Sequence, residues 1–256
     1  MRAVVLALAD LGKSARMQYH ARALAATGVQ VDLVGFDGTP LPRVILDDAR
    51  ITVRRFAASN RRLGQTTSLG YAGVAVFDTL TVMVRLWTVL RSLRPDLVLT
   101  QNPPAFPTLA VSWFALRRRR VRFVVDWHNL GYTVLRLRLG RWHPAVRLAR
   151  WYERRDAQRV DANICVSRAM AAWLETRFGV RRPAVLYDRP AAVFTPLDRA
   201  ERERFRQAIF GRLGVRLGGN ALIVCPTSWT EDEDFDLVVD AVRRLEERIR
   251  GWESAK

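Results

Sequence analysis

The segment of residues 124–132 combines an apolar run with side chains that could take part in chemistry. Asp126, His128 and Asn129 follow the apolar residues directly and offer a carboxylate, an imidazole and an amide. Such groups can take a proton from a hydroxylated substrate and hold the substrate by hydrogen bonds. The alternative interpretation is structural, with Asp126 capping the next turn and Trp127 filling the core.

Short apolar runs alternate with longer amphipathic runs along the whole chain. We expect strands near residues 2–8, 29–35, 51–56, 97–101, 122–126, 162–166, 184–187 and 221–225, and helices near 15–27, 70–93, 105–119, 144–159, 168–178, 199–213 and 233–249. This alternation predicts an α/β fold with a doubly wound parallel sheet. Asp126 then falls at the carboxyl end of a strand, where open parallel sheets bind their ligands.

The loop after the first expected strand carries polar and basic residues. Gly12, Lys13, Ser14 and Arg16 lie between a strand and a helix, a place where backbone amides can hold a phosphate. The dinucleotide-binding and Walker A patterns are both absent. An ordinary turn with Ser14 as N-cap is the alternative. His20 lies inside the following helix, which favours a packing role.

Another polar pair ends the strand expected at 97–101. Gln101 and Asn102 precede a double proline, and their place at a strand end favours ligand binding. Asn102 would also make a good N-cap for the next helix. Ser167 reads first as an N-cap and second as a ligand.

The composition favours anionic partners. The net charge is +17, and the only lysines are Lys13 and Lys256. Nucleic acid, phosphorylated sugars and anionic membranes could all attract such a chain. No helix-turn-helix, zinc-finger or RNP pattern accompanies the arginines, which disfavours nucleic acid.

Two features bear on membranes. The apolar helix 70–93 contains Asp78 and Arg85, so it makes a poor membrane span. Its two faces could instead serve the core and a bilayer interface, next to the basic run from Arg117 to Arg120. The first residues are too short for a signal peptide, so we expect a cytoplasmic protein peripheral to a membrane.

Cys165 and Cys225 each lie in an apolar, strand-like run far from the other. We expect two buried thiols, with no disulfide framework and no metal pair, as in a reducing compartment.

The charged stretch after Pro190 suggests a domain boundary. We expect an N-terminal Rossmann-like domain at 1–190, a linker at 191–219 and the start of a second Rossmann-like domain at 220–256. One strand and one helix cannot cover a sheet, so the second domain is incomplete as written.

Six ordered motifs resemble one family, the β-1,4-mannosyltransferases that act on chitobiosyl diphosphodolichol. The motifs are Gly12 with Ser14 and Arg16-Met17-Gln18-Tyr19-His20; Gln101-Asn102-Pro103-Pro104; Asp126-Trp127-His128-Asn129 through Gly131-Tyr132; Cys165-Val166-Ser167; Tyr187-Asp188-Arg189-Pro190; and Thr227 through Phe235. The resemblance implies a GT-B glycosyltransferase, with the acceptor on the first domain and the nucleotide sugar on the second. It also implies inverting transfer of mannose from GDP-mannose to a chitobiosyl diphosphate lipid on the cytosolic face of a membrane, with no metal or other cofactor.

An inverting transfer needs a base for the acceptor hydroxyl and positive groups for the leaving diphosphate. On the resemblance, the candidates for the base are Asp126 and His128, followed by His20. The expected acceptor-binding residues are Gly12, Lys13, Ser14, Arg16, Gln101, Asn102, Asn129 and Tyr132. The expected donor-binding residues are Thr227, Ser228, Trp229 and Glu231.

Compared with the family, the chain lacks the N-terminal membrane anchor of its eukaryotic members and most of the second domain. A second hypothesis follows, in which the chain is a non-catalytic acceptor- or membrane-binding module, or one half of a split glycosyltransferase. Its partners would then include a separate C-terminal half or other glycosyltransferases.

Overall fold

The computed structural model describes residues 1–57, 68–117, 119–190, 195–214, 223–225 and 234–253, with side chains in the helix at 68–93 described from residue 78 on. The chain divides into two compact units, Met1–Arg189 and Pro190–Lys256.

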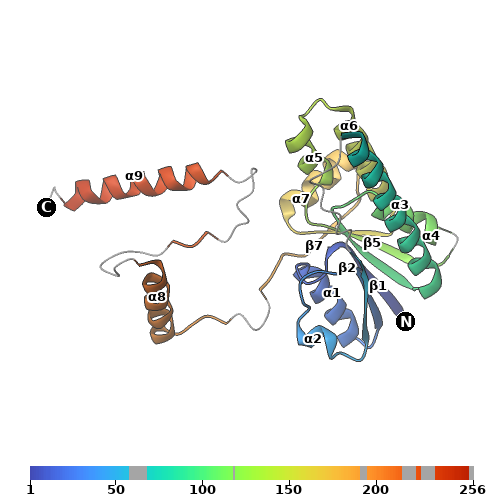
Figure 1. Cartoon of the computed structure of the whole chain (residues 1–256), viewed down its shortest axis with the longest axis horizontal. Coiled ribbons are helices and arrows are strands. Elements are labelled where there is room, and N and C mark those ends of the chain that lie inside the picture. Colours follow the sequence, from blue (N-terminus) through green and yellow to red (C-terminus); the bar gives the residue numbers. More distant parts are fainter. Residues whose placement is uncertain (58–67, 118, 191–194, 215–222, 226–233, 254–256) are drawn as a thin grey trace. The chain divides into compact units, whose positions relative to one another are not determined.

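The first unit is built on a sheet of seven parallel strands in the order β3-β2-β1-β4-β5-β6-β7 (Figure 1). The strands are β1 (Arg2–Asp10), β2 (Gln30–Phe36), β3 (Ile51–Phe56), β4 (Leu97–Asn102), β5 (Arg122–Trp127), β6 (Ala162–Cys165) and β7 (Ala184–Val185). All neighbouring strands pair in parallel. The predicted parallel α/β sheet is therefore confirmed.

Helices connect the strands. They are α1 (Ala15–Ala26), α2 (Arg43–Leu46), α3 (Ser68–Leu93), α4 (Thr108–Leu116), α5 (Gly131–Leu139), α6 (Pro144–Ala157) and α7 (Arg168–Trp173), which continues into a π-helical turn, Leu174–Phe178. Ser167 accepts a hydrogen bond from the amide of Met170, which confirms its predicted role as N-cap of α7.

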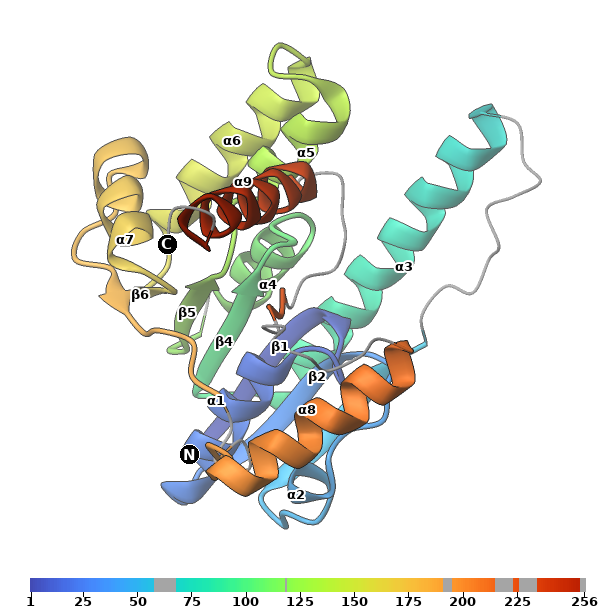
Figure 2. The same ribbon diagram turned by 90° about the vertical axis from the view of Figure 1, so that its left-hand side faces the viewer.

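Strand β1, the third in the sheet order, buries both of its faces, and its successive side chains point to opposite sides of the sheet. Val4 and Leu6 face a core that includes α3 and α4. Ala3, Val5 and Ala7 face a second core that includes α1. Figures 1 and 2 show these helices on opposite sides of the sheet, as a doubly wound fold requires.

Alanines contribute to the core between α1 and the sheet, together with larger side chains such as Met17 and Leu33. Ala21 and Ala25 of α1 are buried in the same core as Ala3 and Ala7 of β1. Since alanine side chains are short, the axis of α1 can lie close to the sheet.

The chain changes direction across the sheet between β1 and β4. Strands β2 and β3 extend the sheet to one side of β1, and β4 to β7 extend it to the other. The loops after β1 and β4 therefore diverge at the carboxyl edge, at the switch point where such sheets bind ligands.

Several local predictions were wrong at this edge. Helix α5 was not predicted, and α4 begins at Thr108 and not near residue 105. Asn102 does not cap a helix, because it is the fully buried last residue of β4. Its amide nitrogen donates instead to the carbonyl oxygen of Asn129, at 3.1 Å, and to Glu153, at 3.3 Å.

The apolar helix α3 has one core face. Leu86 and Leu90 are fully buried, whereas Leu80, Val84 and Trp87 are exposed. Among the described residues, no helix is long and apolar enough to cross a membrane.

The basic run lies at the other edge of the sheet from Asp126. Arg117 and Arg119 precede the first residue of β5, and Asp126 is near its last. At about 3.3 Å per strand residue, the two ends of β5 are separated by roughly 15 to 20 Å. Arg117 packs over the ring of Trp113, at 5.6 Å.

The second unit contains α8 (Arg199–Leu213) and α9 (Phe235–Glu253), and both helices were predicted. Asp198 caps α8 by a reciprocal capping box with Glu201. The strand expected at 221–225 is absent from its described part, since residues 223–225 lie in no strand. Cys225 is exposed, so its prediction as a buried thiol was wrong, whereas Cys165 is buried as predicted.

Glu153 of α6 joins three elements behind the carboxyl edge. Its carboxylate accepts from the amide of Gly131, at 2.8 Å, from that of Tyr132, at 3.5 Å, and from the side chain of Asn102. The first two amides belong to the first turn of α5, which would otherwise have free donors. A Cβ at position 131 would come within 2.8 Å of the Glu153 carboxylate, so a larger residue there would displace the carboxylate from its present position.

Burial raises the pKa of Glu153 to about 7, although the hydrogen bonds from Asn102, Gly131 and Tyr132 act to lower it. An unfolded glutamate titrates near 4.3, so the folded state holds a proton that the unfolded state releases between these pH values. The contribution of Glu153 to stability therefore falls as the pH rises from about 4.3 to 7, by about 4 kcal/mol at most.

We expect Glu153→Gln to remove this pH dependence. The free energy of unfolding, measured by urea denaturation from pH 5 to 8, should rise in the variant relative to the unsubstituted protein up to about pH 7 and then stay level. A difference between the two proteins that is constant over this range would contradict the assignment.

Candidate active site

Three basic side chains converge on one carboxylate at the carboxyl edge of the sheet. Arg16 donates to both oxygens of Asp126, with Nε at 2.7 Å from Oδ2 and Nη2 at 3.0 Å from Oδ1. The Nε2 atoms of His20 and His128 lie 2.7 and 3.4 Å from the same Oδ2. The Asp126 side chain itself is fully buried.

The folding pattern explains why these groups meet. Arg16 and His20 are four residues apart in α1, so they lie on the same face of the helix. That face points across β4 toward β5, about 10 Å from β1 at the usual strand spacing. His20 thus belongs to the cluster together with the two leading candidates for the base.

Asp126 is held in its charged form. Burial acts to raise its pKa, but hydrogen bonds from His128, His20 and Arg16 more than offset this effect and hold the pKa of Asp126 well below its usual range. A carboxylate that resists protonation is a weak proton acceptor. The geometry therefore favours Asp126 as the group that orients the two imidazoles.

A polar cavity of about 450 Å³ opens beside this cluster. It is lined by Ala9, Asp10, Lys13, Ser14, Ala15, Arg16, Gln101, His128 and Asp188. The lining comes from the ends of β1, β4, β5 and β7, so the cavity lies at the switch point of the sheet. Four predicted acceptor-binding residues and one candidate base line it.

Gln101 has an unused hydrogen-bonding atom at this cavity. Its Oε1 is buried and accepts no hydrogen bond from the described part of the chain. Buried polar atoms are nearly always paired, so this unpaired oxygen is unusual.

Three amides in the loop after β1 have partners within the protein. The amide of Gly12 donates to the carboxylate of Asp10, and the amides of Lys13 and Ser14 donate to backbone carbonyls. The Ser14 hydroxyl donates to the carbonyl oxygen of Asp10, at 2.8 Å, and does not cap α1. A side chain at Gly12 would come within 2.2 Å of the Thr39 carbonyl oxygen, so this glycine serves close packing. An anion here would meet the side chain of Lys13.

Other predicted site residues lie outside the polar cavity. Tyr132 packs in the core against Trp173, with ring centroids 6.0 Å apart. Asn129 is exposed and contributes its carbonyl oxygen to the contact with Asn102. Trp127 is fully buried and its indole donates to Asn163, as its core interpretation predicted. The predicted donor-binding residues Thr227, Ser228, Trp229 and Glu231 lie outside the described residues.

Sequence reasoning missed Asp188. Its carboxylate accepts from Nη1 of Arg16, at 2.9 Å, so the Arg16 guanidinium bridges Asp126 and the end of the first unit. Its place in the Tyr187-Asp188-Arg189-Pro190 motif was the available signal.

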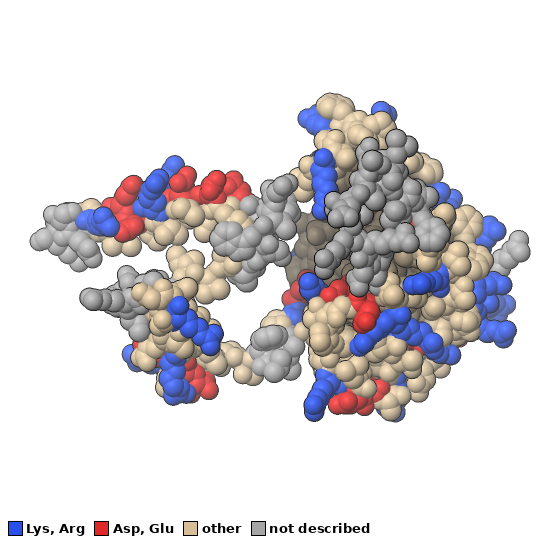
Figure 3. All heavy atoms as spheres, in the orientation of Figure 1, with Lys and Arg blue, Asp and Glu red and all other residues tan. Residues whose placement is uncertain are grey.

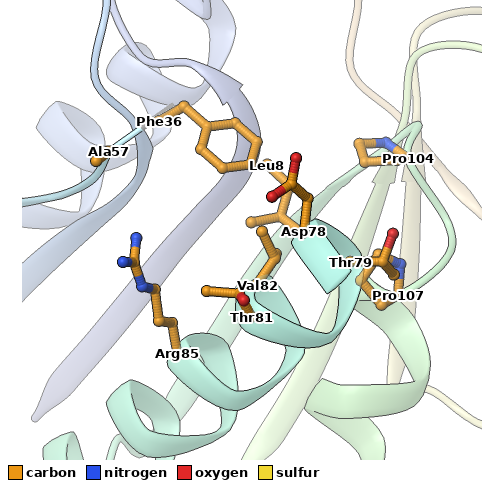
Figure 4. Close-up of a pocket in the computed structure, with 10 residues that line it drawn as sticks. All are labelled: Leu8, Phe36, Ala57, Asp78, Thr79, Thr81, Val82, Arg85, Pro104 and Pro107. Atoms are coloured by element: carbon orange, nitrogen blue, oxygen red, sulfur yellow. The ribbon is translucent and has the colours of Figure 1, made fainter. Parts of the chain in front are cut away.

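A second cavity of about 450 Å³ lies beside α3 (Figure 4). Leu8 and Phe36 come from strand ends, Val82 and Arg85 come from α3, and Pro104 follows β4.

Within the described ranges, no group of three or more His, Cys, Asp or Glu side chains could hold a metal ion. That no metal is required stays a prediction.

Positive charge is widely distributed on the surface. On the face seen in Figure 3, Lys and Arg side chains form several separate groups, with fewer acidic residues between them. On this face the groups do not form one continuous track, and the prediction of no nucleic-acid partner remains untested.

The sequence profile of the glycosyl transferase 4-like domain family matches residues 12–189, which include the whole Asp126 cluster. This chain belongs to that family. The predicted resemblance to the chitobiosyldiphosphodolichol β-mannosyltransferases is confirmed as well. The protein of that name from Yarrowia lipolytica is 36% identical over 258 residues, covering 96% of this chain and 54% of the relative.

Two further comparisons extend this picture of a glycosyl transferase 4-like chain. A protein of Arabidopsis thaliana named UDP-glycosyltransferase TURAN is 35% identical over 295 residues and covers all of this chain and 63% of the relative. The crystal structure of a glycosyltransferase from Rickettsia africae matches with a TM-score of 0.55 at 13% identity, covering 96% of this chain and 57% of that one. The chain thus spans little more than half the length of these relatives, and its fold is of the predicted GT-B type.

We expect Asp126→Asn to destabilise this family member strongly, because it leaves the buried Arg16 guanidinium without a full counter-charge. The free energy of unfolding should fall by about 3 kcal/mol or more in urea denaturation. Asp188→Asn is the matched control, since Asp188 also accepts from Arg16 but is 65% exposed. It should cost less than about 1 kcal/mol. Equal losses in the two variants would contradict the buried ion pair.

Proposed function

We propose that this chain provides the acceptor-binding part of an inverting mannosyltransferase. Mannose would pass from GDP-mannose to the terminal sugar of a chitobiosyl diphosphate polyprenol or dolichol at the cytosolic face of a membrane. The observation that carries the proposal is His128, which lines the polar cavity while bonded to the buried, charged Asp126. The names of the relatives support the acceptor class.

His128 is the best candidate for the base. Its ring is 22% exposed, that of His20 is 13% exposed, and only His128 of the two lines the cavity. With Nε2 donating to Asp126, the lone pair that can take a proton is on Nδ1. The imidazolium formed during transfer would be stabilised by the Asp126 carboxylate beside it.

In the proposed reaction, His128 removes the proton of the acceptor hydroxyl as its oxygen attacks the anomeric carbon of the donor sugar. The bond to the nucleotide diphosphate breaks on the opposite face, which inverts the anomeric configuration. Gln101 Oε1 would accept a hydrogen bond from a second hydroxyl of the acceptor sugar. The exposed Lys13 would contribute positive charge near the diphosphate of the lipid-linked acceptor.

We expect His128→Ala to lower kcat for mannosyl transfer by about a hundredfold or more, the usual contribution of a general base. His143→Asn is the control, because His143 caps α6 away from this cluster, and it should retain nearly full activity. The assay follows radiolabelled mannose from GDP-mannose into a synthetic chitobiosyl diphosphate lipid, in this chain or in a complete relative with the equivalent substitutions. Near-normal turnover in His128→Ala would exclude this residue as the base, and a larger loss in His20→Ala would assign the role to His20.

A non-catalytic acceptor- or membrane-binding module, or one half of a split glycosyltransferase, is the second candidate. The coverage of little more than half of the relatives favours testing it. Calorimetry of this chain with GDP-mannose separates the two, because a module that binds only the acceptor should give no binding heat. A parallel titration with UDP-sugars tests the donor, since one relative is named as a UDP-glycosyltransferase.

We also propose that the chain is peripheral to an anionic membrane, as its net charge of +17 and exposed apolar residues on α3 suggest. Sedimentation with vesicles of anionic lipid should show binding that weakens several-fold between about 50 and 300 mM salt. Neutral vesicles are the control. Absence from anionic vesicles at every salt concentration would contradict the proposal.

A further inference from the structure

An apolar groove of about 530 Å³ lies behind the residues that form the polar cavity. Its walls are α5, α6 and the loop after β4, represented by Val134, Leu148 and Phe106. These three side chains are 42%, 64% and 56% exposed, so the groove opens to solvent between them. Its volume is within the range of sites that bind small molecules.

The polar groups at this groove already have partners. The Glu153 carboxylate accepts from Gly131 and Asn102, and the Tyr152 hydroxyl accepts from the amide of Ala110, at 2.7 Å. A polar ligand would therefore gain little here, whereas a hydrocarbon would bury apolar surface at no hydrogen-bonding cost.

The groove and the polar cavity share the same two chain segments. Gln101 and His128 line the cavity, and two or three residues later Pro103 and Gly131 line the groove. At no more than about 3.6 Å per residue, each segment takes about 11 Å or less to pass from one to the other. The bond from Asn102 to the carbonyl oxygen of Asn129 ties the two segments together.

The residues around the groove are of the types that contact membrane lipids, as expected for a site that takes an amphiphile from a membrane. The Arg150 guanidinium lies 6.0 Å from the ring of Tyr132, which lines the groove, and Arg136 also acts on that residue electrostatically. Trp142 and Trp151 of the same α5–α6 hairpin are 77% and 55% exposed. Basic residues beside exposed tryptophans are typical of helices that lie in a membrane interface.

We infer that the α5–α6 groove binds the isoprenoid chain of the lipid-linked acceptor, while the sugar-diphosphate end of the same molecule reaches the polar cavity. This inference rests on the proposed function, because it places the lipid part of the proposed acceptor. It assigns the isoprenoid chain of the acceptor to α5 and α6, and it leaves the proposed contact of α3 with the membrane surface unchanged.

Farnesyl diphosphate is a suitable probe, with inorganic diphosphate as its headgroup control. Calorimetric titration of the full chain should give a Kd at least about tenfold lower for farnesyl diphosphate than for inorganic diphosphate. Leu148→Glu should remove about tenfold of that affinity, because it places a carboxylate in the mouth of the groove. Val134→Glu, from the opposite wall, should do the same.

Leu137→Glu is the matched control, since Leu137 lies on the same hairpin, is 63% exposed and does not line the groove. It should bind farnesyl diphosphate as the unsubstituted chain does. Equal affinity for the two probes, or equal losses in Leu148→Glu and Leu137→Glu, would overturn the inference. Undiminished binding of farnesyl diphosphate in both groove variants would also overturn the inference. The isoprenoid chain would then bind elsewhere, as in the cavity beside Val82 and Phe36.

The inference and the proposed function can fail separately. In one outcome, mannose is transferred to a chitobiosyl diphosphate with a short alkyl chain, but farnesyl diphosphate binds no more tightly than inorganic diphosphate. The groove assignment is then wrong and the proposed function stands. If farnesyl diphosphate binds in the groove and no sugar is transferred to either acceptor, the groove stands and the catalytic proposal fails.

Discussion

The ion pair between Arg16 and Asp126 holds the candidate site together. It joins the first helix to the fifth strand across β4, and through Asp188 it extends to the end of the first unit. A carboxylate with 0% exposure would be costly without such a partner. With the ion pair in place, the charged Asp126 carboxylate can also hold the imidazoles of His20 and His128 at the edge of the sheet. A neutral side chain at this position would lack the electrostatic attraction for them.

The sheet could be predicted because strands such as β1, β4 and β5 are apolar runs that end in polar residues. Parallel strands buried on both faces have this composition, and the polar residues then meet at one edge. The joint presence of Asp126 and His128 at that edge followed from the sequence alone. The sequence alone did not predict that Arg16, His20 and His128 would all meet Oδ2 of Asp126, because this arrangement depends on the distance between α1 and β5.

The helix α5 shows why some elements escape a reading of local sequence. Its first amides are satisfied by Glu153, which lies 22 residues after Gly131, so no capping residue precedes the helix in the chain. Asn102 was misread for the same reason, since its partners are Asn129 and Glu153 and not its own neighbours. Cys225 was misread because the apolar run around it forms no strand in residues 223–225.

The alanines between α1 and β1 have a consequence for the chemistry at the other end of the helix. Ala3, Ala7, Ala21 and Ala25 are buried in the core between β1 and α1, the helix that carries Arg16 and His20. A bulkier residue at any of these positions would lift the helix and withdraw the guanidinium and the imidazole together. Evolution of this active centre is thereby restricted by residues that never meet a substrate.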